Sequence, residues 1–124
     1  MMTQAQRIQN ETRARILKAL AHPTRVYIVD RLQHGSLTVH EIADEVDSDM
    51  STVSRHLAAL RDAGVLQSEK SGSSIEYSLT CPCIPSIFAG IEIVIRKNEE
   101  ARSQIASSFG LLTMDVSRPT HRSS

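Results

Sequence analysis

Apolar residues at helical spacing mark the first two elements of the chain. Over Gln4–Leu20 they predict an amphipathic helix with apolar positions at Ile8, Ile16, Leu17 and Leu20. His22-Pro23 ends this helix, and Pro23 suits the first turn of a second helix because its missing N–H needs no partner there. The second helix is expected to stop at Gly35 and to enter the core through Val26, Ile28, Val29 and Leu32.

Two shorter helices joined by a tight turn are predicted next. Thr38 and Glu41 form an S/T-x-x-E capping box, in which each side chain satisfies a free backbone N–H group at the start of a helix that runs through Val46. The turn Asp47-Ser48-Asp49 supplies Asp49 as an N-cap for a helix from Met50 to Ala63. The side chains expected to be buried are Ile42, Ala43 and Val46 in one helix and Val53, Leu57 and Leu60 in the other.

Alternating polar and apolar residues then predict a short β-hairpin. Its strands are the run from Val65 to Lys70 and the run Ile75–Leu79, with a turn at Ser71–Ser74. Beyond Pro85 a last helix is apolar over more than one face, with the apolar residues Ile87, Phe88, Ile91, Val94, Ile95 and Ile105. Such an excess of apolar surface calls for a partner.

This order of elements gives the fold class: mainly α with a small β-hairpin, arranged as a winged helix-turn-helix. A chain of 124 residues can bury one core but is too short for a second domain of ordinary size. One domain for DNA binding and dimerisation is therefore expected over residues 1–110. Residues 111–124 are expected to form a disordered tail, because Pro, Ser, Thr, Arg and His occur there without periodicity.

Composition and charge restrict the setting and the partners. No apolar run reaches the roughly 20 residues of a membrane span and no secretory signal is evident, so we expect a cytoplasmic protein without membrane association. The formal net charge of zero by itself argues weakly against nucleic acid. Its distribution matters more, because six basic and two acidic residues lie between Arg7 and Arg31, whereas acidic residues cluster from Glu41 to Asp49.

The helix that begins at Met50 is the candidate for reading DNA. If its apolar residues face inward, small hydroxyls and one long cation face outward, on Ser51, Thr52, Ser54 and Arg55. These side chains can approach base edges and phosphates, and His56 is a candidate for a contact with the DNA backbone. Taken singly, Ser and Thr are equally well explained as solvated residues of a surface helix. Together with the capping box, the turn and the hairpin, they predict double-stranded operator DNA as a partner.

The segments LAHPTRVYIVDRL and SDMSTVSRHLAALRDAGVL and the hairpin end IEYSL resemble the arsenical-resistance repressor (ArsR/SmtB) family. The resemblance covers roughly Leu20 to Leu79, and the S-x-V-S-x-H-L-x-x-L-x-x-A-G-V pattern is specific for the recognition helix of that family. It implies a homodimer that packs through its first and last helices, repression of an operon, and release of the DNA by an inducer.

Carried over by position, the resemblance implies DNA contacts at Val39, Met50, Ser51, Thr52, Ser54 and Arg55. It also implies contacts of the wing from Lys70 to Ser74. The chain departs from the family at two places. Met50 stands where many members carry a polar residue, and the wing has a single lysine where relatives often have several basic residues.

Cys81 and Cys83 are the candidate inducer site. The best-known sensing sites of the family are absent, since the helix from Thr38 to Val46 has no C-x-C and the last helix lacks the Asp and His ligands of the zinc sensors. Two thiolates in Cys81-Pro82-Cys83 can chelate one thiophilic centre, such as trivalent arsenic or antimony (arsenite or antimonite) or a soft metal ion. No constitutive cofactor is expected, and a third ligand is not apparent from the sequence.

Other uses of the cysteine pair remain open. Cysteines are often small buried hydrophobic residues at a junction between elements. Reversible oxidation, or a persulfide that bridges the pair, is the rival trigger for a repressor of the same fold, since a disulfide across one residue is strained and easily reduced.

Two other classes of protein fit the sequence less well. A small thiol enzyme is disfavoured, and no enzyme activity is expected, because the chain has no C-x-x-C, Gly-rich phosphate loop or catalytic triad order. An interaction module that dimerises without DNA stays open, and failure to bind any duplex at low salt would favour it.

Overall fold

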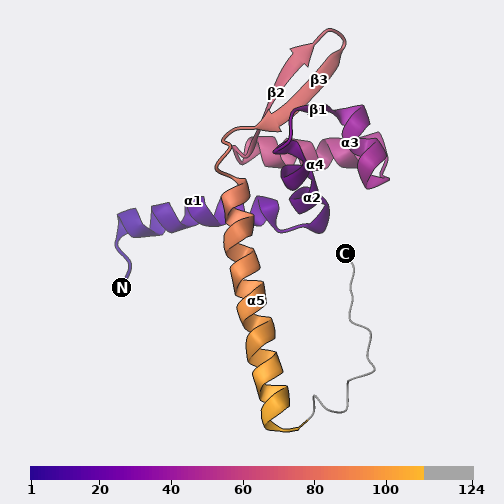
Figure 1. Cartoon of the computed structure of the whole chain (residues 1–124). Coiled ribbons are helices and arrows are strands. Elements are labelled where there is room, and N and C mark those ends of the chain that lie inside the picture. Colours follow the sequence, from indigo (N-terminus) through magenta and orange to yellow (C-terminus); the bar gives the residue numbers. More distant parts are fainter. Residues whose placement is uncertain (111–124) are drawn as a thin grey trace. The chain divides into compact units, whose positions relative to one another are not determined.

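The computed structural model describes residues 1–110 and divides the chain into two compact units, Met1–Pro85 and a second unit that begins at Ser86. The described part of the second unit consists mainly of helix α5 (Pro85–Ser108). The elements of the first unit, shown in Figure 1, are α1 (Gln4–Leu20), α2 (Pro23–Leu32), β1 (Leu37–Thr38), α3 (Val39–Val46), α4 (Met50–Asp62), β2 (Leu66–Ser71) and β3 (Ser74–Leu79).

The predicted caps begin the two helices of the helix-turn-helix. The Thr38 hydroxyl accepts a hydrogen bond from the Glu41 N–H at 3.2 Å, and the Glu41 carboxylate accepts one from the Thr38 N–H at 2.9 Å. This reciprocal capping box starts α3, as predicted. Asp47 then adopts a left-handed backbone conformation at φ 53°, which ends α3 and turns the chain toward α4.

The core of the first unit forms where α2, α3, α4 and the sheet meet. Its fully buried side chains come from the predicted faces of α2 and α4, namely Ile28, Val29, Val53, Leu57 and Leu60. Ile42 and Ala43 of α3 are buried as predicted, and Val46 is half-buried. The prediction for Val26 is wrong: this residue is exposed rather than in the core, because α2 turns its neighbours Ile28 and Val29 inward.

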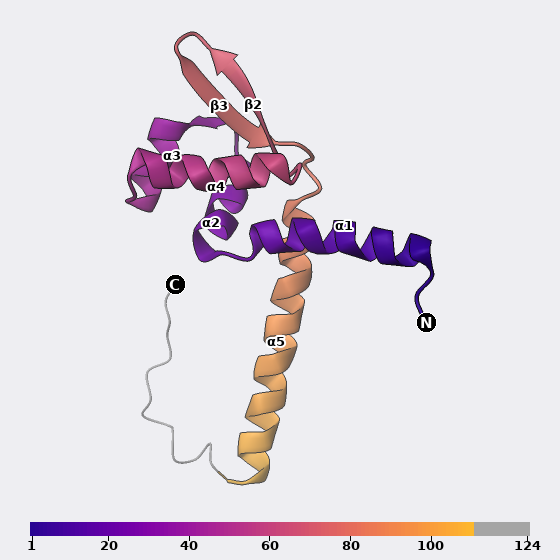
Figure 2. The same ribbon diagram turned by 180° about the vertical axis from the view of Figure 1, so that it is seen from behind.

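The sheet has three strands in the order β1-β3-β2, one more than predicted. β2 and β3 pair in an antiparallel hairpin that closes at Ser71 and Ser74, and Figure 2 shows this wing from behind. β1 pairs with the other edge of β3, with Leu37 opposite Tyr77. A strand of only two residues has no alternation to detect in the sequence, so this strand emerges only from its partner.

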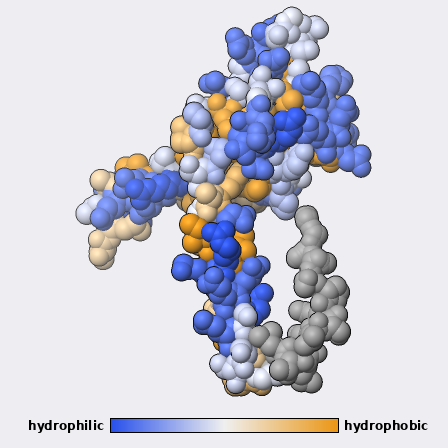
Figure 3. Space-filling model, viewed as in Figure 1, coloured by the Kyte–Doolittle hydropathy of each residue, from blue (hydrophilic) through white to orange (hydrophobic). Residues whose placement is uncertain are grey.

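Helix α5 has the predicted apolar residues but buries none of its side chains within the single chain. Figure 3 shows apolar residues at the surface of this helix beside hydrophilic ones. The exposed apolar residues include Ile91, Ile93, Val94, Ile95 and Ile105. One domain was predicted over residues 1–110, and the buried apolar side chains of the described residues lie between Leu20 and Tyr77. The predicted tail at 111–124 lies outside the described residues. Among residues 1–110, no helix is both long and apolar enough to cross a membrane.

Candidate functional site

The outer surface of α4 carries the residues predicted to contact DNA. Val53, Leu57 and Leu60 are each 0% exposed, so they anchor one face of the helix in the core. The opposite face presents exposed Ser51, Ser54 and Arg55, with exposed Met50 at the start of the helix and half-buried Thr52 beside them. Helical periodicity thus places small hydroxyls and one long cation together at the N-terminal half of α4.

Asp49 organises the N-terminus of this surface. Its carboxylate accepts hydrogen bonds from the Thr52 N–H at 2.7 Å and from the Ser51 hydroxyl at 3.0 Å. These hydrogen bonds, with that of Thr52 the strongest, hold the pKa of Asp49 below its ordinary value. The cap therefore stays ionised at neutral pH and fixes the first turn of α4.

Arg55 is held only loosely within the protein. Its Nη2 lies 3.5 Å from Oγ1 of Thr52, at the limit of hydrogen-bond distance, and the side chain is exposed. A guanidinium with this freedom can turn toward a base edge or a phosphate.

The remaining predicted DNA-contact residues lie in different surroundings. Val39 is the half-buried first residue of α3, and Lys70 is exposed on β2 opposite Ile75. His56 is half-buried, and its Nδ1 accepts a hydrogen bond from Arg25 of α2 at 3.0 Å. The ring of His56 is therefore hydrogen-bonded to another helix, whereas the side chains of Ser51, Ser54 and Arg55 are exposed.

The wing has an electrostatic feature beyond the single lysine evident from the sequence. Glu69 of β2 lies directly opposite Glu76 of β3, so two carboxylates share one face of the hairpin. The Ser36 hydroxyl donates to Glu76 at 3.2 Å. The side chain of Lys70 is the only cation on β2 and β3, and the wing is consequently acidic overall.

Sequence reasoning missed two polar clusters around α2. Tyr27 donates its hydroxyl to Glu45 at 2.8 Å, and Arg31 forms an ion pair with the same carboxylate at 3.0 Å. The hydrogen bond to Glu45 raises the pKa of Tyr27. The other cluster joins His22, Arg25 and His56. Because these partners lie far apart in the chain, no local pattern pointed to either cluster.

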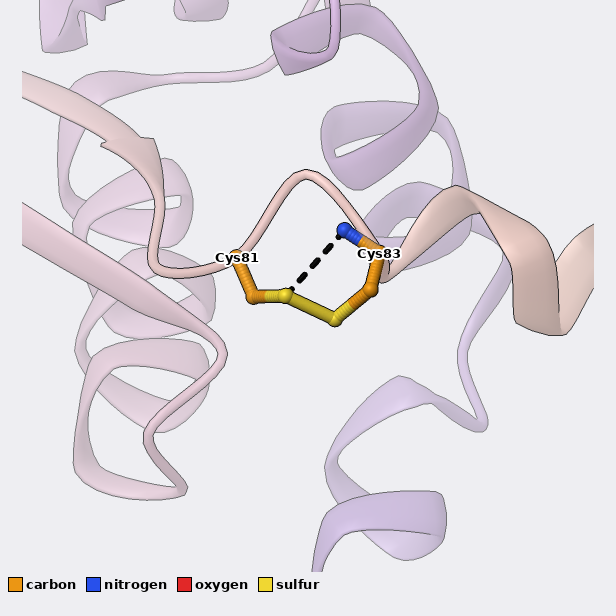
Figure 4. Close-up of a disulfide and its surroundings, with 2 residues drawn as sticks. All are labelled: Cys81 and Cys83. Carbon is orange, nitrogen blue, oxygen red and sulfur yellow. Dashed lines mark hydrogen bonds between the residues drawn. A yellow bond between two sulfur atoms is a disulfide. The ribbon is translucent and has the colours of Figure 1, made fainter.

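Cys81 and Cys83 lie in the connection between β3 and α5, and Figure 4 shows them joined by a disulfide. The chain makes a turn here in which the Ile84 N–H donates to the Cys81 carbonyl at 3.1 Å, with Pro82 at the position where proline favours a turn. This turn brings the two Cα atoms to 5.1 Å, and the Cys83 N–H donates to Sγ of Cys81 at 3.2 Å.

The surroundings of the pair are open. Cys81 is half-buried and Cys83 is exposed, which does not fit the alternative of small buried hydrophobic residues. Within residues 1–110 no three His, Cys, Asp or Glu side chains gather as a metal site would require. The sequence left the third ligand of a metalloid or metal open, and the described residues supply no such third side chain beside Cys81 and Cys83.

A family profile and several known proteins match this chain. Residues 22–68 match the profile of the family described as bacterial regulatory protein, arsR family. The regulator NmtR of Mycobacterium tuberculosis is 39% identical over 66 residues, which cover 53% of this chain and 55% of that protein. The chain thus spans about half the length of NmtR. The uncharacterised regulator Rv0081 of M. tuberculosis is 33% identical over 78 residues, covering 62% of this chain and 68% of that protein.

Solved structures show the same fold. The crystal structure of M. tuberculosis Rv0081 superimposes with a TM-score of 0.69 at 29% identity, over 77% of this chain and 96% of that one. The homodimeric winged helix-turn-helix DNA-binding domain of Mb0332 from Mycobacterium bovis gives a TM-score of 0.70 at 26% identity, over 81% and 93% of the two chains. The fold is thus a winged helix-turn-helix, and the chain belongs to the arsR family of bacterial regulatory proteins.

Proposed function

We propose that the protein is a DNA-binding transcriptional repressor that reads duplex operator DNA with the N-terminal half of α4. The observation that carries the proposal is the division of this helix into two faces. Val53, Leu57 and Leu60 anchor it completely in the core, whereas Ser51, Ser54 and Arg55 are exposed on the other side. A helix presented in this way after a tight turn fits the major groove.

The exposed residues would have different tasks at the DNA. Arg55 can donate two hydrogen bonds to a guanine, and Ser51 and Ser54 are small enough to let the helix approach the base edges. Met50 would contact a thymine methyl group, and Lys70 a phosphate near the tip of the wing.

The exposed face of α4 formed by Ser51, Ser54 and Arg55 is the proposed reading surface. Replacement of its one cation tests whether this surface contacts DNA. Arg55→Ala should weaken binding to a labelled duplex from the region upstream of the protein's own gene by about 1–3 kcal/mol, roughly 5- to 150-fold, measured by fluorescence anisotropy. Arg61→Ala removes the same charge at an exposed residue in the last turn of the same helix and should have little effect on DNA binding. Absence of binding to any duplex at low salt would instead favour a dimerisation module without DNA.

The repressor is proposed to act in the cytoplasm as a homodimer that packs through α1 and α5. Both helices expose apolar side chains in the single chain, Ile8 and Leu17 in α1 and Ile91 and Val94 in α5 among them. Mb0332 of M. bovis, which shares this fold, is homodimeric. A two-fold pair of α4 helices would meet half-sites about one helical turn of DNA apart, at roughly 34 Å.

Release from DNA is proposed to depend on Cys81 and Cys83. In the reduced state, two sulfurs held by the turn at Pro82 would chelate a thiophilic inducer, either trivalent arsenic or antimony or a soft metal ion. The third ligand would come from solvent or from the partner subunit. The pair lies on the covalent connection between the wing and α5, so a change there can act on both.

A second trigger, oxidation of the pair, is favoured by the disulfide. The turn at Pro82 holds the two Cα atoms 5.1 Å apart, and the two sulfurs are joined. Formation of this bond from two thiols transfers two electrons and two protons to an oxidant, and two equivalents of a small thiol reverse the reaction by exchange and leave as the small-molecule disulfide. A persulfide on one cysteine, attacked at its inner sulfur by the other thiolate, would form the same bond with release of hydrosulfide.

One experiment separates the two triggers. Reduced wild-type protein on labelled operator DNA is treated with arsenite, antimonite or the thiol oxidant diamide, and its intact mass is measured in parallel. Release by arsenite with metalloid bound supports ligation, whereas release by diamide with loss of two hydrogens supports oxidation. If Cys81→Ser/Cys83→Ser responds to both reagents as the wild type does, the sensing role of the pair is wrong.

A further inference from the structure

Arg25 of α2 forms hydrogen bonds with both α1 and α4. Its Nε donates to Nδ1 of His56 in α4 at 3.0 Å, and its Nη1 donates to the carbonyl oxygen of Ala19 in the last turn of α1 at 3.2 Å. Both hydrogen bonds are partly buried. One planar guanidinium therefore ties α1 and α2 to the middle of the helix that carries the reading surface.

His22 completes the cluster at the start of α2. It is the N-cap of this helix, and its Nδ1 accepts a hydrogen bond from the Thr24 N–H at 3.1 Å. Its ring packs against that of His56 with the centroids 4.5 Å apart. Both imidazoles use Nδ1 as an acceptor, so in their neutral form each carries its proton on Nε2. Because a ring that ligates a metal through Nε2 keeps its proton on Nδ1, this arrangement is not that of a metal site.

The charged groups that shift the pKa of His56 are all cationic. Burial, followed by the charges of His22, Arg25 and Arg55, lowers the pKa of His56. The elements α3 and β2 also pack against α4, but none of their side chains is among the groups that lower the pKa of His56. The groove of about 260 Å³ beside Arg25 carries two further cations and one carboxylate, those of Arg15, Lys18 and Asp62. The surroundings thus select the neutral imidazole, which is the only form able to accept from Arg25.

We propose that Arg25 is a positioning residue for DNA binding, which holds α4 in its reading orientation through the neutral imidazole of His56, and that proton uptake by His56 weakens DNA binding. The inference rests on the proposed role of α4 in reading DNA. A protonated His56 has no lone pair on Nδ1 and places an N–H and a positive charge against the Arg25 guanidinium. The link between α2 and α4 is then lost.

The effect on DNA follows from the position of His56 in the helix. His56 comes directly after Arg55 and two residues after Ser54, on the same rigid turn of α4. Hydrogen bonds to base edges require well-defined distances and angles, so a small rotation of this turn reduces the affinity. Arg25 itself need not touch the DNA for this to happen.

The test measures the affinity of full-length wild type and variants for the labelled upstream duplex by anisotropy at pH 7.5 and pH 5.5. Wild type should bind more weakly at the lower pH, with a loss of less than about tenfold, because the lowered pKa of His56 leaves part of the protein in the neutral form at pH 5.5. His56→Asn keeps an acceptor near the place of Nδ1 but does not titrate. It should bind more tightly than His56→Leu at pH 7.5 and lose less than wild type at pH 5.5.

Two comparisons distinguish a positioning role from a direct phosphate contact and from a general effect of acid. Arg25→Met should weaken binding at both pH values with an unchanged dependence on salt, because a lost phosphate contact would lower the salt slope by about 0.9. His40→Gln, at an exposed histidine of α3, should keep the wild-type response to pH. Circular dichroism of each variant at both pH values confirms that the variants compared are folded.

The outcomes that overturn the inference are different from those that overturn the proposed function. Wild type that binds DNA with equal or greater affinity at pH 5.5, His56→Asn with the full acid response, or Arg25→Met with a reduced salt slope would each refute the positioning role while DNA binding stands. Wild type that binds no duplex at pH 7.5 and low salt would refute the proposed function, and the inference with it.

Discussion

At the scale of single residues, α4 places buried and exposed side chains on separate faces. Leu57 is fully buried, and Ser54 and Arg55, which precede it, are exposed. Neighbouring positions on one helix thus serve the core and the surface, because side chains rotate by about a quarter of a turn per residue.

Truncation of a buried residue of α4 should therefore act on stability. Leu57→Ala is expected to lower the free energy of unfolding by about 2–5 kcal/mol, because it removes buried methyl groups and leaves a cavity. Urea denaturation followed by circular dichroism measures this loss. Ser54→Ala, on the exposed face of the same helix, should change the free energy of unfolding by less than about 0.5 kcal/mol. Equal effects of the two changes would contradict the division into two faces.

The titration of His56 should also appear in the stability of the protein. The pKa of His56 in the folded protein lies below the value of 6.5 in the unfolded chain, chiefly because of burial. The unfolded chain then binds more protons just below pH 6.5, so the contribution of His56 is fully present above pH 6.5 and declines as the pH falls toward the folded pKa. Thermal unfolding between pH 7.5 and pH 5 should show a larger decrease for wild type than for His56→Asn. A parallel decrease in both proteins would argue against a lowered pKa.

At the scale of elements, the wing carries an unfavourable pair. Glu69 and Glu76 are directly opposite each other in the antiparallel hairpin. Like charges at such positions repel each other, and they would also repel DNA phosphates if Lys70 meets the DNA as proposed. In that case the wing would contribute less to DNA binding than a basic hairpin.

Reversal of one charge tests this interpretation of the wing. Glu69→Lys should form a favourable cross-strand pair with Glu76, stabilise the protein by about 0.2–1 kcal/mol, and raise the affinity for DNA. The slope of log affinity against log salt should become steeper by about 0.9 if the new lysine meets a phosphate. Glu69→Gln removes the repulsion without adding a cation and should leave the slope unchanged. An unchanged affinity of Glu69→Lys would place the wing away from the DNA.

At the scale of the whole molecule, the apolar residues of α5 set the need for a partner. Ile91, Val94 and Ile105 are 47%, 57% and 58% exposed in the single chain, and no residue of this helix is buried. Each buried side chain of this size is worth about 1.5–3 kcal/mol, so a second copy that covers them would stabilise the assembly.

Charges on α5 should accordingly disrupt the proposed homodimer. Ile91→Asp/Val94→Asp is expected to shift the protein to a monomer in sedimentation experiments, because two charges would have to be buried in an apolar interface. Affinity for an operator with two half-sites should fall with it. Ser103→Asp adds a charge to the same helix at an exposed polar position and serves as the control. A dimer that persists in the double variant would place the interface elsewhere.

The sequence by itself determined the local elements and their faces. α1 has the predicted bounds, and the capping box at Thr38 and the N-cap at Asp49 begin their helices as predicted. The reason is that a helix start, a tight turn or an apolar stripe depends on residues a few positions apart.

Only the tertiary structure decided which distant side chains meet. Arg25 and His56 are 31 positions apart, and Tyr27 and Glu45 are 18 apart, so no periodicity links them. The pairing of Leu37 with Tyr77 likewise depends on where β3 lies after the chain has folded. Contacts of this kind follow from the path of the backbone through space, which is set by the burial of the whole core rather than by any short run of residues.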